Sequence, residues 1–499
     1  MAAQNRTRMT IVCLLAAAAA ALLCAALDRR ITDAPNRSDA RQNLQSAWNL
    51  YAWGVFSKSG PSGAKPVPDN YREPLPVLVT AAYMGLLGEG GACIDGDCAG
   101  RGFDSRTLKR INLLWSFAVL CASAALAYRL SRSGPAALVV MVLVFACFLR
   151  DPANIDRLTT EMAASACMLA CALCFGVFAT RPSPWTSLCA GAALGGLALT
   201  KAIFLYAAPL MIAGAAVAAA MRTTAAPARL MKYAGLMCIG VLLTAGPWLI
   251  RNAVHFGSVQ ISDRGGLALY TRALINRMDA FEYRAAFHSW GPGAYRRLVR
   301  GTPLHVSSLE YERGGRAARL NCSADAGFAG DDTVAQRQGR TEDAVSFYAV
   351  ARAQRVRMQH YFEQAGRPNA AHAADAYLRK EALEMIARHP FRHMAASLPL
   401  AWRGMWCFYG GGFWTAFGAA AYAAFVCVCL YAALKQQGEL VAFAAAPLCL
   451  LVLNALLTNS LPRFNTPAIP FMVISLAVGV QAVRRRTGAA AQQENSRDS

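Results

Sequence analysis

One carboxylate has a position suited to chemistry. Asp39 comes shortly after the first long apolar segment and opens an amphipathic run in which Leu44, Trp48 and Tyr51 recur at helical spacing. A carboxylate at such a point could accept a proton from a hydroxyl group within hydrogen-bond reach. It could equally cap the N-terminus of a helix over residues 40–50. Residue type and spacing leave both interpretations open.

Several cations lie at the ends of apolar segments. Arg72, with Glu73 beside it, precedes a proline that favours a helix start, while Lys201 and Arg251 each follow an apolar run. Such cations could bind a phosphate group, or they could extend along apolar surface and reach the membrane interface without a ligand. Arg72 and Glu73 could also pair with each other, and Arg251 could instead have a structural role with Asn252. We take Arg72, Lys201 and Arg251 as candidate phosphate-binding residues and Glu73 as a supporting polar residue.

Three more charged side chains complete the candidate set. Glu161 opens an apolar segment, where the helix dipole favours a carboxylate even without a function. Asp151 lies in the preceding loop, and Arg463 lies in the last loop of the chain. The seven histidines lack metal-ligand spacing, and Asp95 and Asp97 flank a glycine far from Asp39 in the sequence. We therefore assign no metal ligands and expect no required cofactor, with a divalent metal as the open alternative.

The composition indicates a polytopic membrane protein. Of 499 residues, 56% are apolar and only 16% are charged, which is too apolar for an ordinary soluble domain. The apolar residues form blocks close to the 20 or so residues that a membrane-spanning helix needs. The sequence thus predicts an all-α protein with about ten transmembrane helices. The windows are 9–26, 111–128, 135–148, 161–178, 185–200, 202–220, 233–250, 413–434, 440–457 and 466–483.

Arginine and lysine placement predicts the topology. With a cytoplasmic N-terminus, every short inner loop carries positive charge, and Arg484-Arg485-Arg486 leave the C-terminus inside as well. The net charge of +21 therefore indicates topology first, not nucleic acid, and leaves a cationic outer surface that suits anionic lipid headgroups or phosphorylated substrates; a general bias towards arginine in the composition is the open alternative. We predict a multi-pass protein of the bacterial inner membrane with its large loops outside. Cys93 and Cys98 lie in the first outer loop and could form a disulfide.

The predicted division has four parts. Residues 1–250 form a transmembrane module whose first outer loop, 28–110, carries interfacial helices. Residues 251–412 are polar, basic and mainly helical, and lie outside the membrane. Residues 413–483 hold the last transmembrane helices, and the polar tail 484–499 is expected to be disordered.

Five patches in order carry a resemblance to a known class. The chain resembles the GT-C integral membrane glycosyltransferases, in the branch of protein O-mannosyltransferases and aminoarabinose–lipid A transferases. The likeness covers about residues 1–270, and 271–410 carry no motif of the class. The patches are Asp39-Ala40 with Ala47-Trp48-Asn49-Leu50; Arg72-Glu73-Pro74-Leu75; Asp151-Pro152 with Thr160-Glu161; Gly196-Leu197-Ala198-Leu199-Thr200-Lys201; and Pro247-Trp248-Leu249-Ile250-Arg251-Asn252.

The resemblance implies an inverting sugar transfer on the outer face of the membrane. The donor would be a polyprenyl-phosphate sugar, and the acceptor a hydroxyl of a lipid, glycan or protein. Asp39 would be the general base, and cations would stabilise the phosphate leaving group. Two other classes fit the same apolar frame: a transporter or flippase of lipid-linked saccharides, and a non-catalytic envelope assembly protein. Little intramembrane charge and the lack of paired half-repeats count against a transporter.

Overall fold

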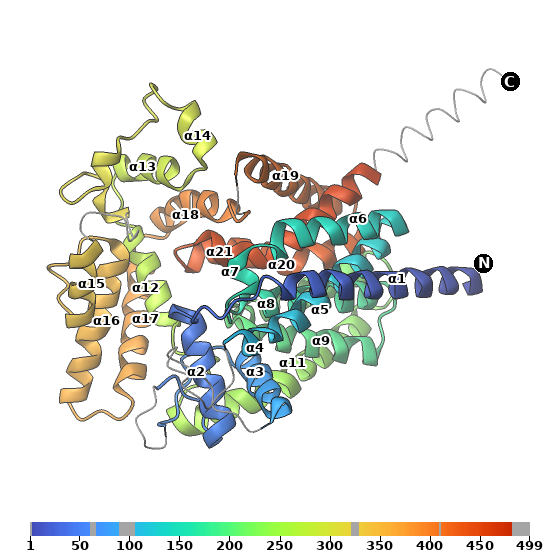
Figure 1. The fold of residues 1–499 in the computed structure, drawn as a ribbon, viewed down its shortest axis with the longest axis horizontal. Coiled ribbons are helices and arrows are strands. Elements are labelled where there is room, and N and C mark those ends of the chain that lie inside the picture. The colour runs from blue at the N-terminus through green and yellow to red at the C-terminus, as the bar shows by residue number, and fades with distance from the viewer. Residues whose placement is uncertain (1, 60–65, 89–104, 321–328, 409–410, 482–499) are drawn as a thin grey trace. The chain divides into compact units, whose positions relative to one another are not determined.

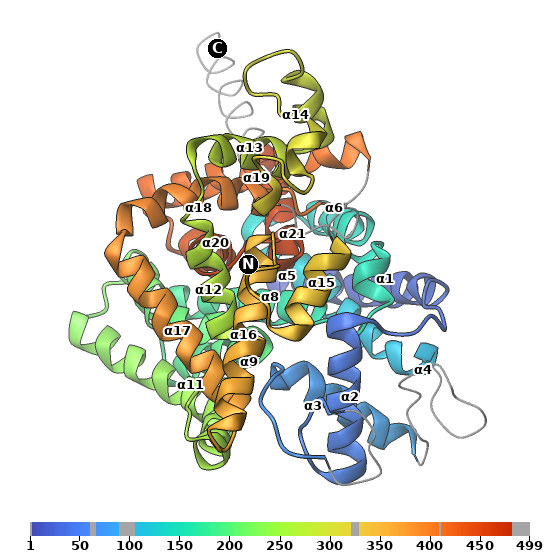
Figure 2. The ribbon, with the colours of Figure 1, turned by 90° about the vertical axis from the view of Figure 1, so that its left-hand side faces the viewer.

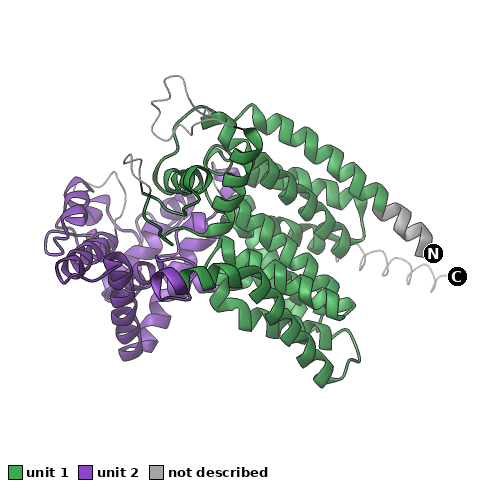
Figure 3. Ribbon diagram, turned by 90° about the horizontal axis from the view of Figure 1, so that it is seen from below, with its two compact units in different colours: residues 1–252, 416–450, 466–499 green, residues 253–415, 451–465 purple. Residues whose placement is uncertain are grey.

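The protein is described here by a computed structural model that covers residues 2–59, 66–88, 105–320, 329–408 and 411–481, with the side chains of 2–9 left out. Cys93, Asp95, Asp97 and Cys98 lie outside these residues. Within them the chain is helical and has no strand. It divides into two compact units, coloured separately in Figure 3: unit 1 comprises residues 1–252, 416–450 and 466–499, and unit 2 comprises 253–415 and 451–465.

The apolar windows become helices. Eight helices of the described chain are long and apolar enough to cross a membrane, and this supports an integral membrane protein. The predicted all-α polytopic class is therefore confirmed. The helices in two of the ten windows are shorter than these eight spans. The window 135–148 becomes α6 (Gly134–Val144) followed by a π-helical turn (Phe145–Leu149), and the window 185–200 becomes α9 (Pro184–Thr200), which has 17 residues. The spans are Thr10–Asp28, Ser105–Ser131, Glu161–Thr180, Ile203–Ala220, Pro227–Phe256, Gly412–Leu434, Gly438–Leu457 and Pro462–Gln481.

Figure 1 labels most of the helices, which are numbered in chain order. The elements up to residue 256 are α1 (Ala2–Asp28), α2 (Ser38–Trp53), α3 (Pro74–Leu87), α4 (Ser105–Lys109), α5 (Ile111–Ser131), α6 (Gly134–Val144), η1 (Phe145–Leu149), α7 (Pro152–Ile155), α8 (Glu161–Thr180), α9 (Pro184–Thr200), α10 (Ile203–Ala220) and α11 (Pro227–Phe256). The later ones are α12 (Gly265–Ile275), α13 (Ala280–Trp290), α14 (Gly293–Leu298), η2 (Ser308–Tyr311), η3 (Ala318–Leu320), α15 (Ala329–Gln338), α16 (Phe347–Gln364), α17 (Ala370–Arg388), α18 (Pro390–Met405), α19 (Gly412–Leu434), α20 (Gly438–Leu457), α21 (Pro462–Asn465) and η4 (Thr466–Ala468).

Glycines set the approach of α9 to α11. A Cβ on Gly191 would lie 2.1 Å from the carbonyl oxygen of Met237, and one on Gly195 would lie 2.8 Å from the Cβ of Thr244. Only hydrogen fits at such a crossing, which is how small residues let membrane helices pack closely. Because both contacts advance along the two helices in the same sense, α9 and α11 run parallel. Their C-terminal ends, which carry Lys201 and Arg251, therefore lie at one end of the pair.

The first loop folds onto the same unit through two helices. The helix α2 buries Ala40, Leu44 and Ala47 against α3, and α3 also packs on α9. Pro74 begins α3, where its missing N–H removes no hydrogen bond. Gly54 ends α2 in the left-handed conformation at φ 64°, with its N–H bonded to the carbonyls of Asn49 and Leu50. The predicted amphipathic and short apolar helices are both present.

Unit 2 is built around α12. This helix packs on α16 and α17, which lie side by side in Figures 1 and 2, and α13 packs on α18. The shared core contains Leu274, Phe347, Leu378 and Leu400. Gly366, at φ 66°, lies in the short connection between α16 and α17.

Two carboxylates fasten α17 to the start of α12. The buried Asp375 accepts hydrogen bonds from the backbone N–H groups of Gly266 and Leu267, at 2.8 and 3.0 Å. Asp263 lies 2.7 Å from Nδ1 of His372. The hydrogen bond to Asp263 raises the pKa of His372, and burial opposes the shift. Folding of unit 2 thus favours the protonated imidazole of His372 relative to the unfolded chain.

His372→Asn should destabilise the protein more at acidic than at basic pH. Because the folded pKa of His372 lies above its unfolded value, its ion pair contributes fully below the unfolded pKa and is lost as the pH rises through the folded pKa. We expect a loss of about 1.5 kcal/mol near pH 6 and less near pH 9, as for a hydrogen bond to a charged group. Thermal unfolding of the purified chain at both pH values tests this. His360→Asn, an exposed histidine on α16, is the control, and an equal loss at both pH values would contradict the prediction.

Candidate active site

Asp39 is held by a buried arginine. Nη2 of Arg72 donates to Oδ1 of Asp39 at 2.6 Å and to Oε1 of Gln42 at 2.5 Å. The Arg72 side chain is 2% exposed and the Asp39 side chain 25% exposed. The guanidinium therefore fixes a carboxylate that solvent still reaches. Arg72 pairs with Asp39 and not, as one alternative had it, with the neighbouring Glu73.

Asp39 lies inside α2, not ahead of it. The helix begins at Ser38, and its N-cap residue, Arg37, makes no side-chain capping bond. Asp39 therefore occupies the first turn, where the helix dipole stabilises a negative charge. The capping alternative is wrong in its geometry, because the side chain is directed to Arg72 on the α3 side of the loop. Stabilisation by the dipole remains compatible with a chemical role.

A second carboxylate, which we did not single out from the sequence, lies next to this pair. Asp69 accepts hydrogen bonds from the backbone N–H groups of Lys58 and Tyr71, at 2.8 and 3.1 Å. Burial raises the pKa of Asp69, and the charges of Lys58 and Arg251 oppose that shift. Nζ of Lys58 lies 3.1 Å from the ring centroid of Tyr71, and the Arg72 guanidinium lies 5.6 Å from the same ring. Tyr71 thus stands between two cations.

Arg251 joins this loop to the end of α11. Its guanidinium lies 4.6 Å from the Trp248 ring and donates to Oδ1 of Asn252 at 2.8 Å and to the Phe56 carbonyl at 3.4 Å. Phe56 and Trp248 meet edge to face with centroids 4.7 Å apart. The aromatic pair therefore seats the loop that carries Lys58 and Asp69 against α11. These contacts explain why a cation and two aromatic residues occur together here.

Lys201 and Glu161 form the third part of the site. Lys201 follows α9 as its C-cap residue, and Glu161 is the first residue of α8. Nζ of Lys201 lies 3.4 Å from Oε1 of Glu161, with side chains 16% and 11% exposed. An ion pair this long is looser than the 2.6 Å contact of Asp39 with Arg72. Lys201 is accordingly a cation that an incoming anion can recruit.

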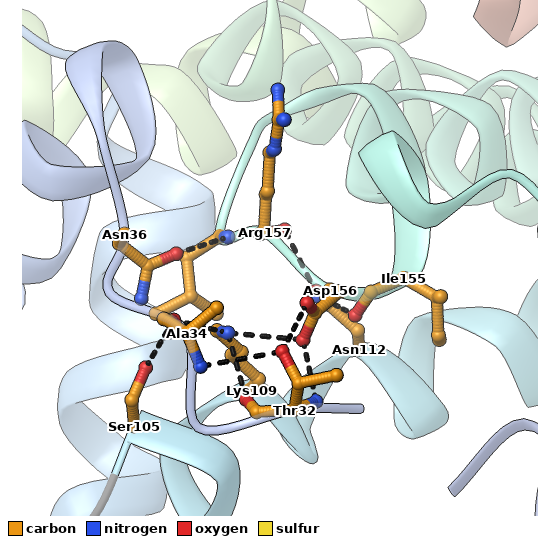
Figure 4. A network of polar contacts seen from close by, with 10 residues as sticks. Thr32, Ala34, Asn36, Ser105, Lys109, Asn112, Ile155, Asp156 and Arg157 are labelled. Atoms are coloured by element: carbon orange, nitrogen blue, oxygen red, sulfur yellow. Dashed lines mark hydrogen bonds and ion pairs between the residues drawn. The ribbon is translucent and has the colours of Figure 1, made fainter. Parts of the chain in front are cut away.

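A separate network braces the loop that leads to α8. Nζ of the buried Lys109 donates to Oδ1 of Asp156 at 2.9 Å and to the carbonyls of Thr32 and Ala34, as Figure 4 shows. Asn112 donates to the carbonyl of Ile155 at 2.9 Å in the same network. These acceptors match the three donors of an ammonium group, which makes the burial of its charge tolerable. The network thus fixes the loop before α8 to the segment between α1 and α2.

The remaining predicted site residues are Asp151, Glu73 and Arg463. Asp151 caps the short α7 through the N–H of Ala153 at 2.9 Å. Glu73 precedes α3 and makes no capping bond. Arg463 belongs to unit 2, with its guanidinium 5.4 Å from the ring of Phe464. The structure thus pairs Asp39 with Arg72 and Lys201 with Glu161, joins Arg251 to the loop after α2, and gives Asp151 a local structural role.

Sequence reasoning missed Lys58, Asp69 and Tyr71. All three lie in or next to the turn rich in Gly, Pro and Lys that follows α2, which reads as a connection. The one signal was the density of charged and aromatic residues between two helices. In the described part of the chain, no three His, Cys, Asp or Glu side chains converge as metal ligands. Metal independence stays a prediction.

Comparisons with known proteins give structural likenesses only. No protein-family model and no curated protein matches the chain. Among solved structures, it is similar to the oligosaccharyltransferase AglB of Archaeoglobus fulgidus in complex with an inhibitory peptide and a dolichol-phosphate. The identity is 11% and the TM-score 0.45, over 98% of this chain and 52% of that one. This chain therefore spans about half the length of that protein.

A second likeness is to ArnT of Cupriavidus metallidurans bound to undecaprenyl phosphate. The identity is 14% and the TM-score 0.36, over 96% of this chain and 79% of that one. Both proteins are GT-C glycosyltransferases, the class that the sequence motifs resemble. Since every TM-score is below 0.5, the function proposed next rests on the residues of the site.

Proposed function

We propose that the protein is a membrane glycosyltransferase. It moves a sugar from a polyprenyl-phosphate donor to a hydroxyl group of a lipid, glycan or protein on the outer face of the membrane. The observation that carries this proposal is the partly exposed Asp39 carboxylate held at 2.6 Å by the buried Arg72. Lys201 and Arg251 lie at one end of the α9–α11 pair in the same unit. A base and phosphate-binding cations are what the reaction requires.

The proposed reaction is a single inverting displacement. The acceptor oxygen attacks the anomeric carbon, its proton passes to the Asp39 carboxylate, and the bond from the anomeric carbon to the phosphate oxygen breaks. The polyprenyl phosphate leaves with the electron pair of that bond. Arg72 acts as a positioning residue, because it is 2% exposed and directs its donors at Asp39 and Gln42. Lys201 and Arg251 stabilise the charge that develops on the phosphate.

The test is donor turnover by the purified full chain in liposomes. The probes are undecaprenyl-phosphate pentoses and hexoses, with membrane lipids of the host as acceptors, and the readout is free undecaprenyl phosphate together with labelled acceptor. We expect both products from one donor class. Donor that crosses the bilayer without releasing phosphate would establish the flippase instead. No release and no crossing with any of these donors would favour the non-catalytic assembly protein.

Lys201→Met should weaken donor binding more than it slows chemistry. Loss of a charge-assisted hydrogen bond to the donor phosphate is expected to raise the donor KM by about 10- to 100-fold, with a smaller fall in kcat. Initial rates of undecaprenyl phosphate release measure both constants. Lys232→Met removes an exposed lysine from the first half of α11 and should leave KM unchanged. A Lys201→Met enzyme with the wild-type KM would remove Lys201 from the phosphate site.

A further inference from the structure

Unit 1 contains a cavity far from Asp39. It has a volume of about 500 Å³ and lies between α1, α5 and α8. A volume of this size is typical of ligand-binding cavities. Alanine and cysteine side chains leave the space open, and most of the lining is apolar. Representative lining residues are Ala16 and Ala17 on α1, Cys121 and Ala125 on α5, and Leu173 on α8.

One end of the cavity is cationic. Tyr128, Arg129 and Arg132 line it there, at the C-terminal end of α5. Nη2 of Arg129 donates to the carbonyl of Gly176 at 2.8 Å and to Glu439 at 2.7 Å, while its buried Nε has no partner among the described residues. The exposed Arg132 guanidinium has no ion pair in the described part of the chain. Among the described residues, Glu439 therefore pairs with Arg129, and no carboxylate pairs with Arg132.

This cationic end lies opposite the candidate active site. The helices α5 and α8 both start at the site, where Asn112 contacts the carbonyl of Ile155 and Glu161 contacts Lys201. Both end where Arg129 contacts Gly176. The 17 residues from Asn112 to Arg129 span about 25 Å of helix. A lipid held by its headgroup at Arg132 therefore has its phosphate on the other side of the membrane from Asp39.

We propose that this cavity binds an anionic phospholipid of the leaflet opposite the active site. One acyl chain fills the space between α1 and α5, and the phosphate lies at Arg132. Charge complementarity commits the site to an anionic headgroup, because a neutral chain end would need no cations. The apolar, small-residue walls fit an acyl chain and exclude ordered water, which needs polar partners. The inference does not depend on the proposed transferase activity.

The experiment uses the full chain in phosphatidylcholine nanodiscs that contain a minor fraction of photoactivatable lipid. In one series the probe is a phosphatidylglycerol with a diazirine in its acyl chain, and in the other a phosphatidylcholine with the same chain. Mass spectrometry measures the lipid attached to the α5 peptide. We expect the phosphatidylglycerol probe to label this peptide about fivefold more, the ratio expected for one cation near a membrane surface.

Three variants separate the parts of the site. Arg132→Asn removes the charge while tolerating the left-handed backbone at φ 59°, and it should bring phosphatidylglycerol labelling down to the phosphatidylcholine level. Ala125→Phe fills the cavity and should reduce labelling by both probes, and Ala17→Leu does so from the α1 wall. Arg181→Asn, at an exposed arginine after α8, should change neither.

Two results would overturn the inference. Equal labelling of the wild type by both probes would show that the headgroup is not recognised. Wild-type labelling of a correctly folded filled variant, judged by its elution volume and helix content, would show that the acyl chain lies elsewhere. Because the readout is lipid attachment, neither result bears on sugar transfer.

Discussion

Asp39→Asn should slow release of polyprenyl phosphate by about 10²- to 10⁴-fold, the range for loss of a general base. Asparagine keeps a side-chain oxygen in the place where Oδ1 accepts from Arg72 at 2.6 Å, so the loop geometry should persist. The amide cannot, however, take up the proton of the hydroxyl group that receives the sugar. The donor KM should change little, because Lys201 and Arg251 remain in place.

Turnover and melting temperature together distinguish a catalytic base from a carboxylate that only stabilises the fold. The change removes a favourable interaction with the α2 dipole, about 0.3–1 kcal/mol, and it also removes the charge that pairs with the buried Arg72, so we expect a lower melting temperature. Asp33→Asn alters an exposed carboxylate in the same loop and should leave turnover and melting temperature unchanged. An Asp39→Asn protein with near wild-type turnover would remove Asp39 from the mechanism, whatever its melting temperature.

The sequence predicts the helices well because their signals are local. The spacing of Leu44, Trp48 and Tyr51 places α2, and Pro74 places the start of α3. The apolar windows place the spans, since a run of apolar residues needs no distant partner to be recognised. The window before Asp151 is the informative exception. There the helix changes to a π-helical turn over Phe145–Leu149, just before Asp151 caps the short α7, and the apolar pattern does not report that change.

The site residues are predicted as types but not as pairs. Asp39 and Arg72 are 33 residues apart, and only the packing of α2 on α3 brings them together. The sequence makes Glu73 the nearest partner for Arg72, although the side chains of adjacent residues do not face each other in regular structure. Asp69 was missed for the opposite reason: its partners, Lys58 and Tyr71, surround it within a segment that reads as a turn.

Burial of charge in unit 2 is the least predictable feature. Arg272 lies in α12, a mostly apolar helix within the region that the sequence predicts to be polar, basic and outside the membrane, and arginine usually faces water. In the structure it is 0% exposed. Its partner Ala455 follows some 180 residues later in the chain, in a segment that reads as membrane-spanning. No local pattern reports such a contact, because it depends on residues 451–465 belonging to unit 2.

Arg272→Met should cost about 3 kcal/mol of stability. Arg272 donates to the carbonyls of Ala455 and His393 and to the side chains of Asn276 and Ser397, at 2.5 to 3.1 Å. Methionine fills much of the volume but leaves the Ala455 carbonyl and Oδ1 of Asn276 without this donor, at about 1–3 kcal/mol for each group that stays unsatisfied, while the His393 carbonyl keeps its hydrogen bond from Oγ of Ser397. Removal of a charge that has no carboxylate partner among these contacts recovers part of that loss. The unsatisfied acceptors outnumber the single charge, so the net effect is destabilising.

Thermal unfolding measures this effect directly. For a unit of this size, about 3 kcal/mol corresponds to a fall of roughly 6–12 °C in melting temperature. Arg300→Met replaces an exposed arginine of the same unit and should stay within about 0.5 kcal/mol of the wild type. A melting temperature for Arg272→Met equal to that of this control would show that the hydrogen bonds merely balance the cost of burying the charge.

The same variant has a signature at acidic pH. Burial first and the Arg272 charge second lower the pKa of His393 to about 4. Because the unfolded chain binds this proton near pH 6.5, the wild type loses stability as the pH falls from about 6.5 to 4. Without Arg272 the folded pKa of His393 rises towards its ordinary value, so the acid-dependent loss becomes smaller. Arg272→Met should thus be less stable than the wild type at neutral pH, and the gap should narrow towards pH 4. A gap that is constant over this range would show that Arg272 does not act on His393.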